Sequence, residues 1–87
     1  MATNYQTKLI KKYKSEGWIV INTIKLSEAG YPDLFLFRNG ITMFIEVKQG
    51  NDTLKPLQRY RLDELAKQGF KAVCLHETKG VIYEPDR

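Results

Sequence analysis

The sequence contains only one cysteine and one histidine. A single cysteine excludes an internal disulfide bond and a zinc site built from several cysteines. Cys74 lies in an apolar run, residues 72–75, where a plain buried thiol is expected rather than a reactive one. The lone His76 at the end of this run is expected to be structural rather than to act as a general base.

The chain also lacks long hydrophobic segments. No apolar stretch approaches the roughly 20 residues that a membrane helix requires, and residues 1–6 lack the apolar core of a signal peptide. We therefore expect a cytoplasmic protein without a membrane partner. Internal repeats, linkers and low-complexity segments are also absent, so the sequence predicts one domain over residues 1–87.

The charge that is present is mildly basic. Fourteen Lys and Arg residues against ten Asp and Glu residues produce a net charge of +4, which suits a polyanionic partner such as DNA. Candidate phosphate contacts on the two expected helices are Lys8, Lys11, Lys12, Lys55 and Arg59. Solvated helix faces explain the same residues equally well. A chain of 87 residues buries only about 60–65 % of its unfolded surface, so a second subunit would help to stabilise it.

Hydrophobic periodicity and turn residues predict two helices and four or five strands. The first helix ends at Gly17, and the second begins near Pro56 and ends before Gly69. The expected helices span residues 4–16 and 56–68, and the expected strands span 18–21, 33–38, 41–48, 71–76 and 81–83. This order, α-β-β-β-α-β(-β), predicts a small α/β fold with a central mixed sheet flanked by helices.

The most informative local signal is Asn39-Gly40 between two apolar runs. It predicts a two-residue hairpin turn, because both residues tolerate positive φ. Counting back from this turn places Asp33 opposite Glu46, with Lys48 two residues further along the same face. Both faces of the hairpin are otherwise mostly apolar, so we expect the sheet to be covered on both sides.

Two opposed carboxylates destabilise a strand pair, so their presence indicates a bound cation. Mg²⁺ is usually held by one or two carboxylates together with waters and substrate oxygens. Asp33 and Glu46 are therefore candidate metal ligands, and the main-chain carbonyl of Val47 is a candidate third ligand. Lys48 would orient or help to deprotonate an attacking water, or offset charge on the phosphorus centre during phosphodiester hydrolysis.

A plainer interpretation fits the same residues. Glu46 would form a salt bridge with Lys48 or Arg38, and Asp33 would cap a loop. Glu-x-Lys alone is a weak motif, but its combination with Pro-Asp, the Asn-Gly turn and opposed carboxylates is much less common, so we favour the metal site. Gln58 is expected to point inward from the second helix, either to bind a metal-bound water or to satisfy a buried polar contact.

These residues resemble a known nuclease motif. Pro32-Asp33 followed by Glu46-Val47-Lys48 is similar to the motif of the PD-(D/E)XK nuclease superfamily. The wider pattern resembles the VRR-NUC family within it, and covers residues 30–34, 44–48 and 57–58 and Gly69. The likeness extends over nearly the whole chain, which would be a minimal stand-alone member of the kind found in phages.

The resemblance implies a restriction-endonuclease-like core and Mg²⁺- or Mn²⁺-dependent DNA cleavage by a homodimer similar to Holliday junction resolvases. It implies that Asp33 and Glu46 bind metal, that Lys48 is catalytic and that Gln58 supports the site. An intracellular location in a phage-infected bacterium would follow. Many relatives carry a metal-binding glutamate on the first helix. This chain has Gln6 on that helix, and its first glutamate, Glu16, comes only at the helix end, which leaves the number of metals open.

Three hypotheses can be separated by experiment. The leading one is a metal-dependent, structure-selective endodeoxyribonuclease that acts on branched or duplex DNA as a homodimer, because a two-fold axis presents paired cleavage centres. The alternative is a non-catalytic nucleic-acid-binding module that keeps the fold and binds DNA without regard to divalent ions. A third is a small structural or interaction protein that binds no metal.

Overall fold

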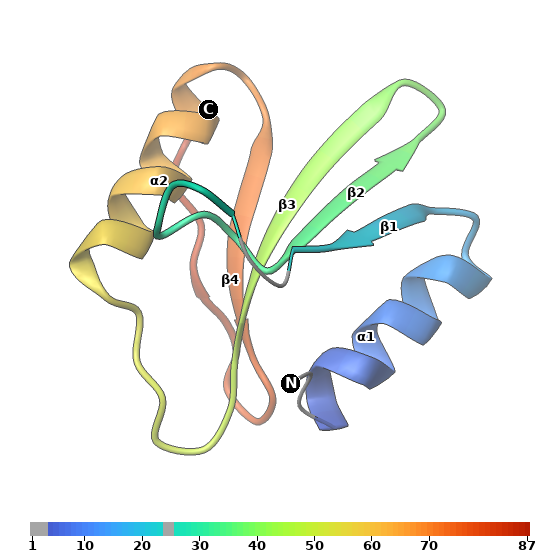
Figure 1. Cartoon of the computed structure of the whole chain (residues 1–87), viewed down its shortest axis with the longest axis horizontal. Helices are drawn as coiled ribbons and strands as arrows, with labels where there is room; N and C mark the ends of the chain where they lie inside the picture. Colours follow the sequence, from blue (N-terminus) through green and yellow to red (C-terminus); the bar gives the residue numbers. More distant parts are fainter. Residues whose placement is uncertain (1–3, 24–25) are drawn as a thin grey trace.

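The computed structural model describes residues 4–23 and 26–87. Its elements follow the expected order (Figure 1). They are α1 (Asn4–Ser15), β1 (Ile19–Asn22), β2 (Leu34–Arg38), β3 (Ile41–Lys48), α2 (Pro56–Lys67), β4 (Lys71–His76) and β5 (Gly80–Tyr83). The sequence therefore predicted the elements closely. The single domain expected over residues 1–87 stays a prediction, and residues 1–3 and 24–25 lie outside the described part of the chain.

The five strands form one mixed sheet in the order β1-β2-β3-β4-β5. Strand β3 pairs with β2 antiparallel and with β4 parallel, whereas β1–β2 and β4–β5 are antiparallel. The parallel pair exists because α2 carries the chain back between β3 and β4, as a parallel connection requires. This arrangement confirms the α/β class and the mixed sheet.

The hairpin between β2 and β3 has the predicted turn and register. Asn39 has φ 50° and Gly40 has φ 77°, as a turn with two left-handed residues requires. The pairing runs from Arg38 opposite Ile41 to Leu34 opposite Ile45. One residue beyond the last pair, Asp33 comes next to Glu46, as the register predicted.

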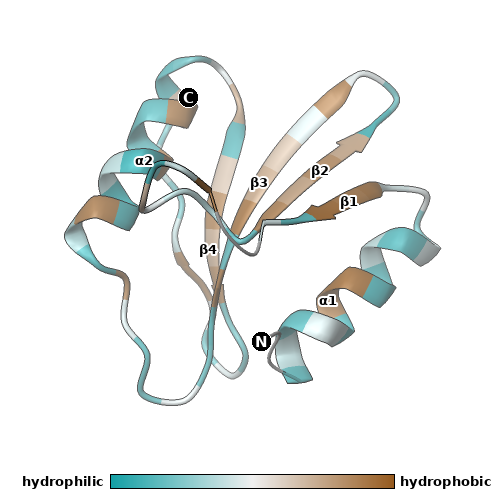
Figure 2. Cartoon of the chain, viewed as in Figure 1, coloured by the Kyte–Doolittle hydropathy of each residue, from teal (hydrophilic) through white to brown (hydrophobic). Residues whose placement is uncertain are grey.

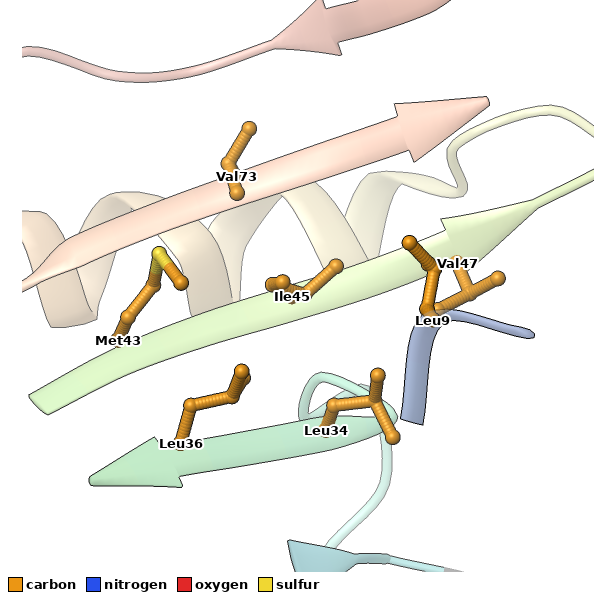
Figure 3. Packing of buried hydrophobic residues seen from close by; sticks show 7 residues of the cluster. All are labelled: Leu9, Leu34, Leu36, Met43, Ile45, Val47 and Val73. Atoms are coloured by element: carbon orange, nitrogen blue, oxygen red, sulfur yellow. The ribbon is translucent and has the colours of Figure 1, made fainter. Parts of the chain in front are cut away.

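One face of the sheet packs against α1. Figure 3 shows Leu34 and Leu36 of β2 facing Ile45 and Met43 of β3 across this surface. The buried cluster consists of Leu9 from α1 and of Leu34, Leu36, Met43, Ile45, Val47 and Val73 from the strands. Because side chains alternate along a strand, Thr42, Phe44, Glu46 and Lys48 of β3 must face the other way.

The opposite face packs against α2. Phe44 of β3 and Leu62 of α2 form a second buried cluster with Ala72 and Cys74 of β4. The two helices lie on opposite sides of the sheet in Figure 1, so the prediction that both faces are covered is confirmed. Figure 2 shows hydrophobic residues along the strands, in agreement with a sheet covered on both faces. Among the described residues, neither helix is long and apolar enough to cross a membrane.

Candidate active site

The site begins with two carboxyl groups on the α2 side of the sheet. Glu46 follows Phe44 by two residues on β3, so its side chain lies on the same face, where it is only 3 % exposed. Asp33, the residue before β2, lies close enough to Glu46 for the two carboxyl groups to interact electrostatically. The predicted convergence of the two acids is therefore present.

This arrangement changes the chemistry of Glu46. Burial, and then the neighbouring charge of Asp33, raise the pKa of Glu46 from 4.5 to about 8, although Lys48 acts in the opposite direction. At neutral pH the carboxyl group thus keeps a proton where a pair of free carboxylates would repel each other.

Lys48 lies next to the acid pair. Its Nζ is 3.5 Å from Glu46 Oε2 and 3.7 Å from Asp52 Oδ2, and its side chain is only 4 % exposed. The Asp52 side chain is 51 % exposed, so it reaches Lys48 from the solvent side. Asp52 is a polar neighbour that the sequence left unplaced, because a loop offers no periodicity from which to infer its direction.

Asp33 is fixed by backbone hydrogen bonds. Its Oδ2 accepts the N–H of Val47 at 2.9 Å. Its carbonyl oxygen accepts the N–H of Thr23 at 2.8 Å and the Thr23 hydroxyl at 3.0 Å. One hydrogen bond therefore holds the carboxylate of Asp33 and two hold its backbone, directly after the fully buried Pro32. The structure shows the contact between Glu46 and Lys48 that the plainer interpretation predicted, whereas the metal site stays a prediction.

His76 has the structural role expected from the sequence. Its Nε2 lies 2.9 Å from the carbonyl oxygen of Gly50, and its Nδ1 accepts the N–H of Thr78 at 3.1 Å. Since one ring nitrogen accepts, the other donates to Gly50, which defines the tautomer. His76 thus holds the loop that carries Asp52. Burial raises the pKa of the neighbouring Cys74 to about 11, in agreement with an inert thiol.

Gln58 is placed on the first turn of α2, where its Oε1 accepts the N–H of Lys55 at 2.9 Å. The structure therefore shows a helix-capping contact of its amide oxygen. A contribution of Gln58 to the acid pair, like a contribution of the Val47 carbonyl, stays a prediction. The first helix presents Gln6 near the site end of the sheet, where it donates to Asn22 Oδ1 at 2.9 Å.

The predicted basic residues do not form one group. Lys8, Lys11 and Lys12 lie exposed on α1, whereas Lys55, the residue before α2, and Arg59 of α2 lie exposed on the other side of the sheet. The guanidinium of Arg59 stacks on the ring of Tyr83 at 4.7 Å. Whether either set contacts DNA stays a prediction. Glu16 lies at the far end of the hairpin, where its carbonyl oxygen accepts from Arg38 at 2.7 Å.

The donor set fits a hard divalent cation. Two carboxylates are the number that Mg²⁺ commonly takes from protein, with waters and phosphate oxygens as its other ligands. Within residues 4–23 and 26–87, no group of three or more His, Cys, Asp or Glu side chains forms a candidate metal cage. A metal held by Asp33 and Glu46 would therefore keep coordination places for water and substrate.

Comparison with known proteins places the chain in a family. The model of the VRR-NUC domain matches residues 3–78. A solved structure described as a VRR_NUC domain superposes with a TM-score of 0.71 at 24 % sequence identity, and the match covers 80 % of this chain and 77 % of the other. At that identity the structural likeness is evidence for the fold alone. No curated protein sequence matches the chain.

Proposed function

Because the chain belongs to the VRR-NUC domain family, which is a family of nuclease domains, we propose that it is a Mg²⁺- or Mn²⁺-dependent endodeoxyribonuclease. The observation that carries this proposal is the pairing of the half-buried Asp33 with the buried Glu46, with Lys48 Nζ 3.5 Å from Glu46. A buried acid and a buried lysine beside a second, half-buried acid are costly to fold. Phosphodiester hydrolysis is a reaction that uses all three groups.

Asp33 and Glu46 would hold the metal ion, with the main-chain carbonyl of Val47 as a further oxygen donor. A bound Mg²⁺ or Mn²⁺ supplies Lewis acidity toward phosphate oxygens and lowers the pKa of water. The protein keeps the two carboxylates in place through the Val47 N–H bond to Asp33 and the rigid strand around Glu46. It also excludes bulk water, since Glu46 and Lys48 are nearly fully buried.

Lys48 would act on the substrate side of the acid pair. Held between Glu46 and Asp52, its ammonium group has few rotamers available, so it is already oriented when the phosphate arrives. A fixed positive charge beside the phosphate stabilises the negative charge that develops on its oxygens. Gln58, at the N-terminal turn of α2, would orient a water through its amide group.

The substrate we propose is branched or duplex DNA. The net charge of +4 and the exposed lysines of α1 and α2 favour a polyanion, and phosphate contacts of this kind are independent of sequence. Selectivity for DNA structure would then depend on how two active sites are spaced in an assembly rather than on base contacts.

We also propose that the protein acts as a homodimer. Ile19 on the edge strand β1 and Ile41 at the start of β3 are 67 % and 56 % exposed. With Phe37 they line a shallow hollow of about 270 Å³. Light scattering should report a dimer, and Ile19→Glu or Ile41→Glu should weaken it. A wild-type protein that is monomeric at concentrations where it cuts DNA would contradict this part of the proposal.

The experiment that tests the function uses labelled four-way junction, flap, duplex and single-stranded DNA, each with Mg²⁺, Mn²⁺ or a chelator. We expect cleavage of branched or duplex DNA with either metal and none with the chelator. If no DNA form is cut but binding persists and is indifferent to divalent ions, the non-catalytic module is the correct reading. If calorimetry detects neither DNA binding nor metal binding, the nuclease proposal is wrong.

A further inference from the structure

Residues 28–31, called here the approach loop, lead directly into Pro32 and Asp33, and Arg61 of α2 holds this loop. Its Nε donates to the carbonyl oxygen of Ala29 at 3.2 Å. The guanidinium carbon lies 4.4 Å from the centre of the Tyr31 ring, and the outer nitrogen NH2 is 3.8 Å from Glu28 Oε2. One side chain therefore contacts three of the four residues that precede Pro32.

Arg61 is itself held in position. Its NH1 donates to Glu64 Oε1 at 3.4 Å, and the Tyr31 hydroxyl donates to the same oxygen at 3.3 Å. Arg61, Tyr31 and Glu64 thus form a closed set of contacts between the approach loop and α2. The Arg61 side chain is only 17 % exposed, whereas its acidic partners Glu28 and Glu64 are 66 % and 40 % exposed, so Arg61 is ordered mainly by the stacking on Tyr31 and by the sum of these contacts.

The remaining residue of the approach loop packs directly on the same helix. Gly30 has φ +86°, and a Cβ atom built on it would lie 2.6 Å from the Cγ atom of Leu57. The loop backbone therefore rests on α2 without space between them. The next residue, Pro32, is fully buried and has a restricted φ, so a shift of Tyr31 is passed on to Asp33.

We propose that Arg61 is a positioning residue for the metal site. It holds the approach loop on α2, and in this way keeps the Asp33 carboxylate on the Val47 N–H and beside Glu46. Arg61 itself reaches neither metal nor substrate in this arrangement. The inference rests on the proposed function, because it assigns Arg61 a role in the same site.

The chemistry of the contacts explains why an arginine stands at this position. A planar guanidinium stacks on Tyr31 and at the same time donates from Nε and from NH1, while NH2 forms an ion pair with Glu28 at 3.8 Å. Lysine has the same charge, but it has one rotating ammonium group and cannot make this set of contacts. Arg61→Lys should therefore lose most of the positioning effect although the net charge is unchanged.

The test measures Mn²⁺ binding to the full chain by calorimetry, without DNA. Removal of an outer-shell positioning group weakens metal binding by roughly 10–100-fold, so we expect Arg61→Ala and Arg61→Lys to bind Mn²⁺ at least about tenfold more weakly than the wild type. In cleavage assays, both variants should need more Mn²⁺ for half-maximal rate but approach the wild-type rate at saturating Mn²⁺.

Arg38→Ala is the matched control. Arg38 makes the same two kinds of contact, because it stacks on Trp18 at 4.5 Å and donates to the Glu16 carbonyl oxygen at 2.7 Å, but at the far end of the hairpin. Arg38→Ala should lower the melting temperature about as much as the Arg61 variants do, and should leave Mn²⁺ affinity unchanged. Equal Mn²⁺ affinities of wild type and Arg61 variants, or equal losses in the Arg38 and Arg61 variants, would overturn the inference. If the wild type binds no Mn²⁺, the proposed function fails as well.

Discussion

The Asp33 carboxylate accepts the backbone N–H of Val47 with an Oδ2–N distance of 2.9 Å. The regular pairing of β2 with β3 ends at Leu34 and Ile45, so Asp33 lies one residue outside the paired strand. A side-chain oxygen thus continues the ladder where the backbone of β2 no longer does. This contact ties Asp33, the residue between Pro32 and β2, to Val47, which lies between Glu46 and Lys48 on β3. The three proposed catalytic groups are therefore held relative to one another by the backbone of β3.

Lys48→Ala should abolish cleavage and leave DNA binding largely intact. Loss of a preorganised charge at the reacting phosphate typically lowers the rate by about 10²–10³-fold. The measurement is single-turnover cleavage together with a binding assay in the presence of Ca²⁺. Lys71→Ala, at the exposed start of β4, is the control and should cut normally. Normal cleavage by the Lys48 variant would exclude the proposed mechanism.

Glu46 makes the stability of the metal-free protein depend on pH. Its pKa is raised from 4.5 to about 8 by folding, so the folded state holds a proton that the unfolded chain has released between these values. The free energy of unfolding should therefore fall as pH rises from 5 to 8, by up to about 1.4 kcal/mol per pH unit, and level off above 8.

Urea unfolding in chelator at several pH values, for wild type and Glu46→Gln, tests this expectation. The amide cannot ionise, so the variant should lack this component and should be the more stable protein at pH 8. Mn²⁺ should stabilise the wild type at pH 8 but not the variant. Parallel pH profiles of the two proteins would show that Glu46 does not carry a raised pKa.

Gly30→Ala should disturb both stability and the metal site. A methyl group at this position meets Leu57 at 2.6 Å, in addition to the strain of the positive φ. Gly69→Ala is the matched control, because Gly69 has φ +93° but no heavy atom within 4 Å of a built Cβ. The control should cost about 1–2 kcal/mol from backbone strain alone. Gly30→Ala should cost more and also weaken Mn²⁺ binding, whereas equal effects would contradict the packing argument.

His76→Ala should loosen the loop after β3. His76 bonds to the Gly50 carbonyl oxygen, and in the same loop the Asp52 N–H donates to the Gln49 carbonyl oxygen at 3.0 Å. Hydrogen exchange of the Asp52 amide should accelerate in this variant, with a moderate loss of cleavage rate. Glu77→Ala is the control, since Glu77 contacts this region through its backbone N–H. Unchanged exchange in the His76 variant would mean that the loop holds its shape without the imidazole.

The elements of the site that could be predicted were those with short-range causes. The Asn39-Gly40 turn determines the hairpin register, and that register alone brings Asp33 to Glu46. Asp52 and Arg61 could not be placed in this way. Each meets its partner from a loop or helix whose direction depends on how α2 packs on the sheet.

Gln58 is a residue whose position could be predicted from the sequence but whose contact could not. Its position on the first turn of α2 was clear from the sequence, but only the structure shows its amide oxygen bonded to the Lys55 N–H. The raised pKa of Glu46 is also a tertiary property, because burial is its largest cause and burial depends on the packing of β4 and α2 around β3. No local pattern reports how much water remains beside a side chain.

The amino-acid sequence by itself determined the order of helices and strands, the faces of the hairpin and the meeting of the two acids, since alternation and turn geometry act over a few residues. Tertiary structure alone decided how deeply Glu46 and Lys48 are buried, where Asp52 reaches the lysine and how Arg61 holds the loop before Asp33. These features depend on contacts between residues far apart in the chain, whose distances are set only when both helices have packed on the sheet.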